Sequence, residues 1–113
     1  MTAVTRAIEE GPIAVLGLGY VGLPLALALA KAGCDIVGFD TAPRIVTSLQ
    51  KGRDLNAEVA DKSLSETTVR FASDPGEMAG ARVFVIAVPT PITDAKAPDL
   101  GPIRDACAAI APH

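Results

Sequence analysis

The sequence predicts an α/β fold in which a parallel sheet carries helices on its faces. Short apolar runs alternate with segments of helical composition, in the order β-α-β-α-β-α-β-loop-α. The strand-like runs contain few polar residues, which is typical of strands buried on both faces of a parallel sheet. Strands and helices that alternate in this way form a sheet through right-handed crossover connections. The length of 113 residues favours a single domain.

The first helix is expected to lie between two buried strands. Residues 12–16, PIAVL, form an apolar run that stops at Gly17. Residues 23–33, LPLALALAKAG, contain good helix formers and end on a glycine, the usual C-terminal stop. Pro24 falls in the first turn of this helix, where its missing N–H leaves no hydrogen bond unmade. Residues 35–40, DIVGFD, then predict a second strand that ends in an acid.

A second helix is predicted over residues 41–52, TAPRIVTSLQKG. Thr41 is the expected N-cap, Pro43 falls in the first turn, and Gly52 ends the helix. The pattern is amphipathic, with an apolar stripe formed by Ile45, Val46 and Leu49.

The second half of the chain gives weaker signals until its last strand. Residues 53–66 are polar and turn-like and have no clear period. The elements expected after them are a short strand in TVRFA at 68–72, a brief helix in DPGEMAGA at 74–81, a strand in RVFVIAV at 82–88, a loop with four prolines at 89–102, and a helix from Ile103. RVFVIAV is the most convincing strand pattern in the chain.

Gly17, Gly19 and Gly22 form the pattern GxGxxG within GLGYVGLP, between the predicted first strand and the first helix. In dinucleotide-binding units the first glycine allows a tight turn, and the second lets a pyrophosphate approach the backbone. The third lets the helix pack closely on the sheet. The helix N-terminus then offers N–H groups and the positive end of its dipole to the phosphates. The pattern therefore predicts a dinucleotide site.

Asp40 supports this interpretation because it ends the second strand, roughly 20 residues after the glycines, as the acid of such sites does. A carboxylate there accepts hydrogen bonds from the two ribose hydroxyls and repels a 2′-phosphate, which favours NAD over NADP. Arg44 lies nearby and would either accommodate that phosphate or lie in solvent. The alternative is that the glycines are ordinary turn residues and that Asp40 caps a helix.

The composition argues against several other classes of protein. With ten basic and thirteen acidic residues and no run of lysine or arginine, nothing indicates nucleic acid or an anionic membrane as a partner. Residues 11–30 are uncharged and long enough to span a bilayer, but their four glycines and two prolines argue against a membrane helix. Cys34 and Cys107 lie far apart, and residues 1–10 lack the apolar core of a secretory leader. A reducing, cytoplasmic setting is therefore expected, and no metal site is predicted.

Taken together, these residues resemble the N-terminal, NAD-binding domain of the UDP-glucose/GDP-mannose dehydrogenase family. The resemblance covers essentially the whole chain from Pro12 and is carried by IAVLGLGYVGLPLALALAKAG, IVGFD and VFVIAVPTPI. GLGYVGLP combined with VPTP is much more specific than the glycines alone. The resemblance implies a Rossmann-like parallel sheet with flanking helices, NAD as the cofactor, and a nucleotide-sugar 6-dehydrogenase as the enzyme.

Two segments resemble one branch of that family. NAEVAD at 56–61 lacks the tyrosine–glutamate–proline–glycine pattern of UDP-glucose dehydrogenases, and VPTPITDAKAPDL at 88–100 is similar to dehydrogenases of UDP-N-acetylhexosamines. The resemblance implies oxidation of the C6 alcohol of UDP-N-acetylglucosamine, -galactosamine or -mannosamine to the uronic acid, for surface polysaccharide synthesis. UDP-glucose 6-dehydrogenase, a stand-alone non-catalytic dinucleotide-binding module, and a β-hydroxyacid dehydrogenase that uses NADP remain alternatives.

The resemblance also implies that residues 1–113 are a partial NAD-binding Rossmann domain, truncated to about the first mononucleotide-binding half. The sugar-binding and catalytic-cysteine domains of the family would then be absent from this chain. We therefore expect the chain alone to be inactive and assign no catalytic residue. Cys34 and Cys107 match no catalytic position and are expected to be small buried hydrophobes. The full-length enzyme is expected to be a homodimer or a higher oligomer.

The implied cofactor contacts come from the glycine turn, the end of the second strand and the end of the last strand. Tyr20 and Val21 would contribute backbone N–H groups to the pyrophosphate, and Thr90 would lie toward the nicotinamide-side ribose. Glu58 would face the sugar nucleotide or lie exposed in its loop. The full set of expected cofactor-binding residues is Gly17, Gly19, Tyr20, Val21, Gly22, Asp40, Arg44, Val88, Pro89 and Thr90.

Overall fold

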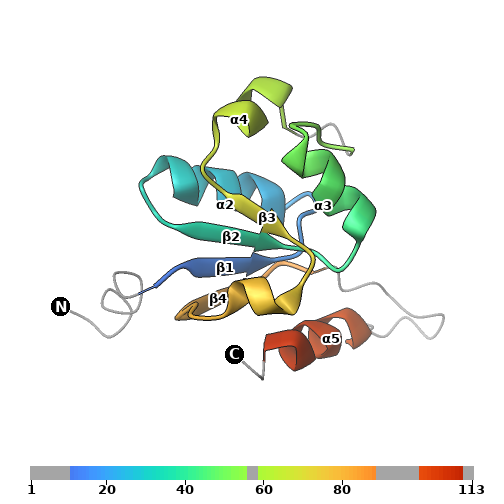
Figure 1. Ribbon diagram of the computed structural model, residues 1–113. Helices are drawn as coiled ribbons and strands as arrows, with labels where there is room; N and C mark the ends of the chain where they lie inside the picture. The colour runs from blue at the N-terminus through green and yellow to red at the C-terminus, as the bar shows by residue number, and fades with distance from the viewer. Residues whose placement is uncertain (1–10, 56–58, 89–99, 111–113) are drawn as a thin grey trace.

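The computed structural model describes residues 11–55, 59–88 and 100–110, and it confirms the predicted α/β fold (Figure 1). In chain order the elements are β1 (Ile13–Leu16), α2 (Gly22–Lys31), β2 (Ile36–Phe39), α3 (Pro43–Gln50), α4 (Asp61–Glu66), β3 (Arg70–Ala72), the 3-10 helix η1 (Pro75–Met78), β4 (Val83–Ile86) and α5 (Gly101–Ile110).

The strands form one sheet of order β3-β2-β1-β4, and every pairing in it is parallel. β1 lies in the centre, where Ile13 pairs with Ile36 on one side and with Val83 on the other. Every residue of β1 and β2 is buried, as expected for inner strands covered on both faces. β4 lies at the edge of the described sheet and is less buried, with Ile86 38% exposed.

Helices cover both faces of this sheet, as Figure 1 shows. α2, α3 and α4 lie over one face, where Leu18, Leu23, Leu49 and Leu64 form an aliphatic cluster. α5 and η1 lie on the other face and contact each other. There Ala106 of α5 joins a core cluster made by residues of β1, β2, β3 and η1. The core is therefore mainly aliphatic on both sides of the sheet, with Phe39 as an aromatic member on the α5 side.

The predicted stop of each of the first two helices is confirmed. α2 ends at Lys31 and α3 at Gln50, each shortly before a glycine with a positive φ angle. The predicted apolar stripe of α3 is also present, since Val46 and Leu49 are buried and Ile45 is half-buried. These two helices therefore follow their local sequence pattern.

The prediction that Thr41 caps α3 is wrong. The helix begins at Pro43, and its N-cap residue is Ala42, which has no side-chain capping bond. The backbone N–H of Ala42 instead donates to Oδ1 of Asp40 at 3.0 Å. The carboxylate of Asp40 is an ionised acceptor close by in sequence, and it holds the chain just before the helix, where the Thr41 hydroxyl was expected to act.

One helix, α4, falls in the segment that the sequence analysis treated as turn-like. Leu64 is its only buried residue, so the six residues offer no helical period to detect. Leu64 packs with Leu18, Leu23 and Leu49, and this tertiary contact stabilises a helix that is too short to be stable alone.

The other differences concern the ends and types of elements. The brief helix expected at 74–81 is a 3-10 helix, and β4 ends at Ile86 instead of residue 88. α5 begins at Gly101, earlier than predicted, because Pro102 fits the first turn of a helix. The predicted proline-rich loop lies mostly at 89–99, outside the described residues.

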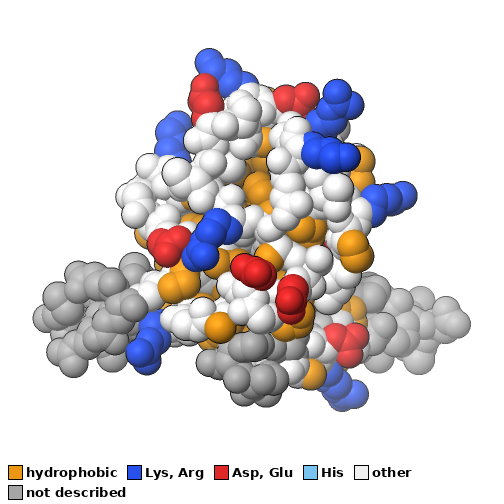
Figure 2. All heavy atoms as spheres, viewed as in Figure 1, with side chains coloured by type: hydrophobic (Ala, Val, Ile, Leu, Met, Phe, Trp, Pro, Cys, Tyr) orange, Lys and Arg blue, Asp and Glu red, His pale blue; other side chains and the backbone are white. Residues whose placement is uncertain are grey.

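In the part of the chain that the structure describes, no helix has the length and apolarity needed to cross a membrane. The uncharged stretch 11–30 forms a strand, a turn and most of α2 instead. Figure 2 shows acidic and basic side chains scattered over the face in view, with hydrophobic side chains exposed between the helices. The two signs of charge are interspersed on that face.

Candidate functional site

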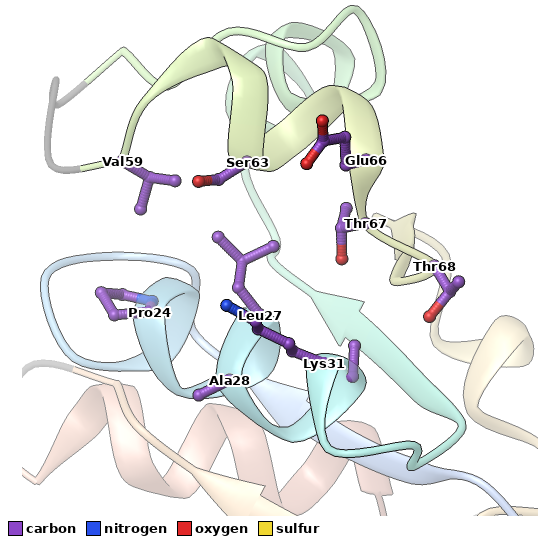
Figure 3. Close-up of a pocket in the computed structure, with 10 residues that line it drawn as sticks. Pro24, Leu27, Ala28, Lys31, Val59, Ser63, Glu66, Thr67 and Thr68 are labelled. Carbon is purple, nitrogen blue, oxygen red and sulfur yellow. The ribbon is translucent and has the colours of Figure 1, made fainter.

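Two of the hollows on the described surface are lined by different kinds of segment. The first, which we call the carboxyl-edge cleft, has a volume of about 690 Å³. It is lined by residues 16–21, residues 39–41 with Ile45, residues 87–88, and the α5 residues Pro102, Asp105 and Ala106. The second, the helix groove, has a volume of about 450 Å³ and lies between α2 and residues 59–68 (Figure 3).

The carboxyl-edge cleft lies where β1, β2 and β4 end, which is where parallel α/β sheets bind ligands. Its volume is in the range of small-molecule sites, about 300–1,000 Å³. Its walls are mostly apolar, and a few polar groups project from strand ends and helix starts. This cleft is therefore the candidate functional site.

The turn after β1 is built without side chains because there is no room for them. Gly17 has a φ of +98°, and a Cβ there would lie 2.7 Å from the carbonyl oxygen of Ala87. A Cβ on Gly22 would collide with the carbonyl oxygen of Gly17 and would also approach the Cβ of Ala87. The start of α2, the turn and the exit of β4 are thus packed backbone against backbone. These contacts confirm the tight turn predicted for Gly17. They also explain on steric grounds why residue 22 is a glycine.

Gly19 differs from the other two glycines of the motif. A Cβ built on it would meet no atom within 4 Å, so packing does not require glycine here. Gly19 lies in the wall of the cleft, and a side chain would project into open space beside the backbone. The arrangement fits a ligand that approaches this backbone closely, which is the role predicted for the second glycine.

The N-terminus of α2 opens beside the same turn. No side chain caps it, and its first turn contains no acidic residue. Tyr20 and Val21, which precede the helix, are 68% and 69% exposed and line the cleft. A helix start of this kind attracts an anion, because its N–H groups and dipole carry partial positive charge.

Asp40 connects the end of β2 to the glycine turn. Its Oδ2 accepts a hydrogen bond from the backbone N–H of Leu18, and its Oδ1 accepts one from Ala42, each at 3.0 Å. The carboxylate therefore has a structural role, but it is not the helix cap of the alternative interpretation, because the N-cap residue of α3 is Ala42, which has no side-chain capping bond. Each carboxylate oxygen has a second lone pair, so the half-buried group retains capacity for two further donors such as the hydroxyls of a diol.

The remaining predicted residues differ in whether they line the cleft. Val88 lines the cleft, whereas Arg44 is exposed and does not line it. Pro89, Thr90 and Glu58 lie outside the described residues.

One wall of the cleft was not predicted from the sequence. Pro102, Asp105 and Ala106 come from α5, and no short motif identified them. Thr41 and Ile45 complete the opposite side, and the amphipathic pattern of α3 could have indicated Ile45.

Neither cysteine is among the residues that line the two hollows. Cys34 is half-buried and packs in the core cluster of β1, β2 and α2, as predicted for a small hydrophobe. Cys107 is exposed on α5, so the prediction that it is buried is wrong. It lies on the turn of α5 next to Ala106, on the side away from the core.

The helix groove is lined by residues of α2 and of the segment 59–68. Figure 3 shows Leu27 of α2 pointing toward Val59 and Ser63, with Lys31 and Glu66 farther along the two walls. Most of the residues that line it are exposed, and the groove follows the line along which α4 lies over α2. It resembles the ordinary surface depression between two helices.

The sequence matches the model of the UDP-glucose/GDP-mannose dehydrogenase family, NAD binding domain, over residues 12–113. The chain belongs to this family. NAD is therefore the cofactor of this type of domain, as predicted, and the carboxyl-edge cleft contains the features that suit it.

Individual members of the dehydrogenase family support the same assignment. The chain is 40% identical over 97 residues to a UDP-N-acetyl-D-glucosamine 6-dehydrogenase from Salmonella typhi, covering 85% of this chain and 23% of that protein. It is 42% identical over 111 residues to an NDP-N-acetyl-D-galactosaminuronic acid dehydrogenase from Ralstonia nicotianae, covering 93% and 25%. The chain thus spans about a quarter of the length of the curated relatives that it matches.

The fold also matches solved structures of the family. The solved structure of a UDP-D-ManNAc dehydrogenase from Pyrococcus horikoshii superposes with a TM-score of 0.81 at 31% identity, covering 89% of this chain and 25% of that one. The match confirms the Rossmann-type fold of the described domain.

Proposed function

We propose that this chain is the NAD-binding part of an NAD-dependent nucleotide-sugar 6-dehydrogenase that oxidises a UDP-N-acetylhexosamine to the uronic acid. The relatives from Salmonella typhi and Ralstonia nicotianae are named for N-acetylated sugars, which supports this branch of the family. Because these relatives differ in the hexosamine, the proposal names the substrate class and no single sugar. Synthesis of surface polysaccharides would use the product.

The observation that carries the proposal is the position of Asp40. Asp40 follows β2, and its carboxylate accepts a hydrogen bond from Leu18 in the glycine turn and retains lone pairs for further donors. In the proposed complex these lone pairs accept hydrogen bonds from the adenosine ribose. The carboxylate would also repel a 2′-phosphate, and Arg44 does not line the cleft, so both observations support NAD over NADP.

The glycine turn would hold the pyrophosphate. Gly19 leaves room for it, Tyr20 and Val21 contribute backbone N–H groups, and the N-terminus of α2 supplies favourable charge. Gly17 and Gly22 keep the turn in the required shape. Val88, Pro89 and Thr90 are proposed to contact the cofactor where β4 ends. Bound NAD supplies the hydride acceptor for oxidation of the C6 alcohol.

Catalysis is proposed to require more of the protein than this chain. The chain spans about a quarter of its relatives, and neither Cys34 nor Cys107 lines the cleft, so no described thiol is placed to act on a bound substrate. We propose that residues 1–113 bind NAD and that the sugar nucleotide needs further domains. A cytoplasmic setting and a homo-oligomeric full-length enzyme belong to the same proposal, the first because Cys34 and Cys107 are free thiols.

The test is a calorimetric titration of the chain with NAD⁺ and with NADP⁺. We expect NAD⁺ to bind more tightly than NADP⁺. Asp40→Asn keeps the size of the side chain but removes its charge, and should weaken NAD⁺ binding at least about tenfold, since hydrogen bonds to charged groups are strong. Asp61→Asn in α4 is the matched control and should bind NAD⁺ like the wild type, because Asp61 lies outside the cleft.

Thermal unfolding of each variant would show that the comparison is made between folded proteins. A preference for NADP⁺, or NAD⁺ binding that Asp40→Asn leaves unchanged, would contradict the proposed role of Asp40. If neither dinucleotide bound at millimolar concentration, the proposed cofactor function of this chain would be wrong.

A further inference from the structure

The α5 wall of the carboxyl-edge cleft contains an acidic side chain, Asp105, that the packing of the fold does not require. Ala106 is 6% exposed and packs in the core together with the half-buried Phe84 and Val88, so it fixes the rotation of α5 against the sheet. Pro102 lies one turn earlier on the same face. Asp105, next to Ala106 on the helix, is consequently held at the rim of the cleft.

Asp105 is one of two charged residues that line the cleft within the described chain, and the other is Asp40. Asp40 is engaged by the backbone of Leu18 and Ala42. By contrast, among the residues that the structure describes, none donates a hydrogen bond to the carboxylate of Asp105 or forms an ion pair with it. Its side chain is exposed and is available to a ligand.

The two carboxylates lie on walls that come from opposite faces of the sheet. Asp40 stands beside the start of α3, which covers one face, whereas Asp105 comes from α5 on the other (Figure 1). The wall on the α3 side presents Ile45, and the wall on the α5 side presents Pro102 and Ala106. Together these walls form an apolar slot that has a carboxylate at its rim.

On the basis of the proposed NAD binding, we propose that Asp105 recognises the adenine ring by accepting a hydrogen bond from its exocyclic amino group. With the pyrophosphate at the glycine turn and the ribose at Asp40, the flat, apolar adenine would lie in the slot between α3 and α5. Ile45 and Pro102 contact the faces of the ring. An ionised carboxylate only accepts hydrogen bonds, so it suits an amino group and disfavours a carbonyl oxygen at the same place.

The test compares NAD⁺ with nicotinamide hypoxanthine dinucleotide, in which a carbonyl oxygen replaces the adenine amino group. The two ligands carry the same charge and the same phosphates and differ only at C6 and the adjacent N1, which is protonated in hypoxanthine, so the effect of Asp105→Ala on the ratio of their affinities, and not the ratio alone, assigns the contact to Asp105. We expect the wild-type chain to prefer NAD⁺ about fivefold, the value of one hydrogen bond in a partly exposed site. Asp105→Ala should bring the ratio close to one.

The Asp105→Asn variant provides a second test of the same contact. Its amide can donate to the hypoxanthine oxygen as well as accept from adenine, so this variant should bind the hypoxanthine ligand more tightly than the wild type does. Asp61→Asn is the control and should retain the wild-type ratio. Asp105 is exposed, and circular dichroism of both variants should match that of the wild type.

The outcomes separate this inference from the proposed function. NAD⁺ binding with no preference over the hypoxanthine ligand, or a preference that survives Asp105→Ala, would overturn the role of Asp105 and leave NAD binding intact. Absence of binding for either dinucleotide to the wild-type chain, measured at millimolar ligand, would overturn the proposed function and this inference with it.

Discussion

The carboxyl-edge cleft and the helix groove are both hollows of small-molecule size, but close-packed backbone forms part of the wall only in the cleft. The glycine-turn wall of the cleft is shaped by backbone, because Gly17 and Gly22 leave no space for a Cβ and the Asp40 carboxylate ties Leu18 to the end of β2. The groove is lined by residues of α2 and of the segment 59–68, most of which are exposed.

This difference shows which property identifies a functional site. A depression between two helices arises wherever side chains fail to fill the space between them, and other side chains can replace them at little energetic cost. A wall of close-packed backbone constrains the sequence strictly. Glycines that form such a wall indicate that its shape has a use, so substitutions in the cleft should have larger effects than substitutions in the groove.

The largest effect is expected from Gly22→Ala. The added Cβ would collide with the carbonyl oxygen of Gly17, a backbone atom that cannot move without distorting the turn and the exit of β4. We expect a loss of about 3 kcal/mol in the free energy of unfolding, measured by urea denaturation. A loss below 1 kcal/mol would mean that the turn adapts easily and that the contrast between the two hollows is wrong.

Gly19→Ala should affect ligand binding far more than stability. Its Cβ meets no atom within 4 Å and its φ angle is not in the left-handed region, so the free energy of unfolding should change by less than about 0.5 kcal/mol. The methyl group would lie in the space proposed for the pyrophosphate, and we expect NAD⁺ affinity to fall about tenfold by calorimetry. Unchanged affinity would place the phosphates elsewhere.

The smallest effect is expected in the helix groove. Ser63→Ala changes an exposed residue that lines the groove and should alter the free energy of unfolding by less than about 0.5 kcal/mol. NAD⁺ affinity should equal that of the wild type. A clear loss of NAD⁺ binding in this variant would connect the groove to the cleft and remove the distinction between them.

The sequence predicts well what depends on neighbouring residues. The inner strands, the stripe of α3 and the tight turn at Gly17 all follow from short patterns, and the structure contains them. The cofactor contacts of the individual site residues remain predictions. The two ends of α3 illustrate the limit, since Gly52 follows its C-terminus as predicted whereas the expected cap at Thr41 is replaced by Asp40.

Features that depend on distant residues could not be predicted from local pattern. α4 is stabilised through Leu64, whose partners come from the glycine turn, α2 and α3. The hydrogen bond from Leu18 to Asp40 requires β1 and β2 to be paired in register. Asp105 lines the cleft only because α5 returns to the far face of the sheet, and no motif in the sequence encodes that return.

The position of β1 in the middle of the sheet has a consequence for the order of folding. Only one helix separates Ile13 from its partner Ile36 in the sequence, whereas most of the chain separates it from its other partner, Val83. Closing the longer loop costs more chain entropy, so pairing of β1 with β4 should be the slow event in refolding. Because the glycine turn rests on Ala87 and Val88, a newly made chain should acquire its affinity for NAD only in that final kinetic phase.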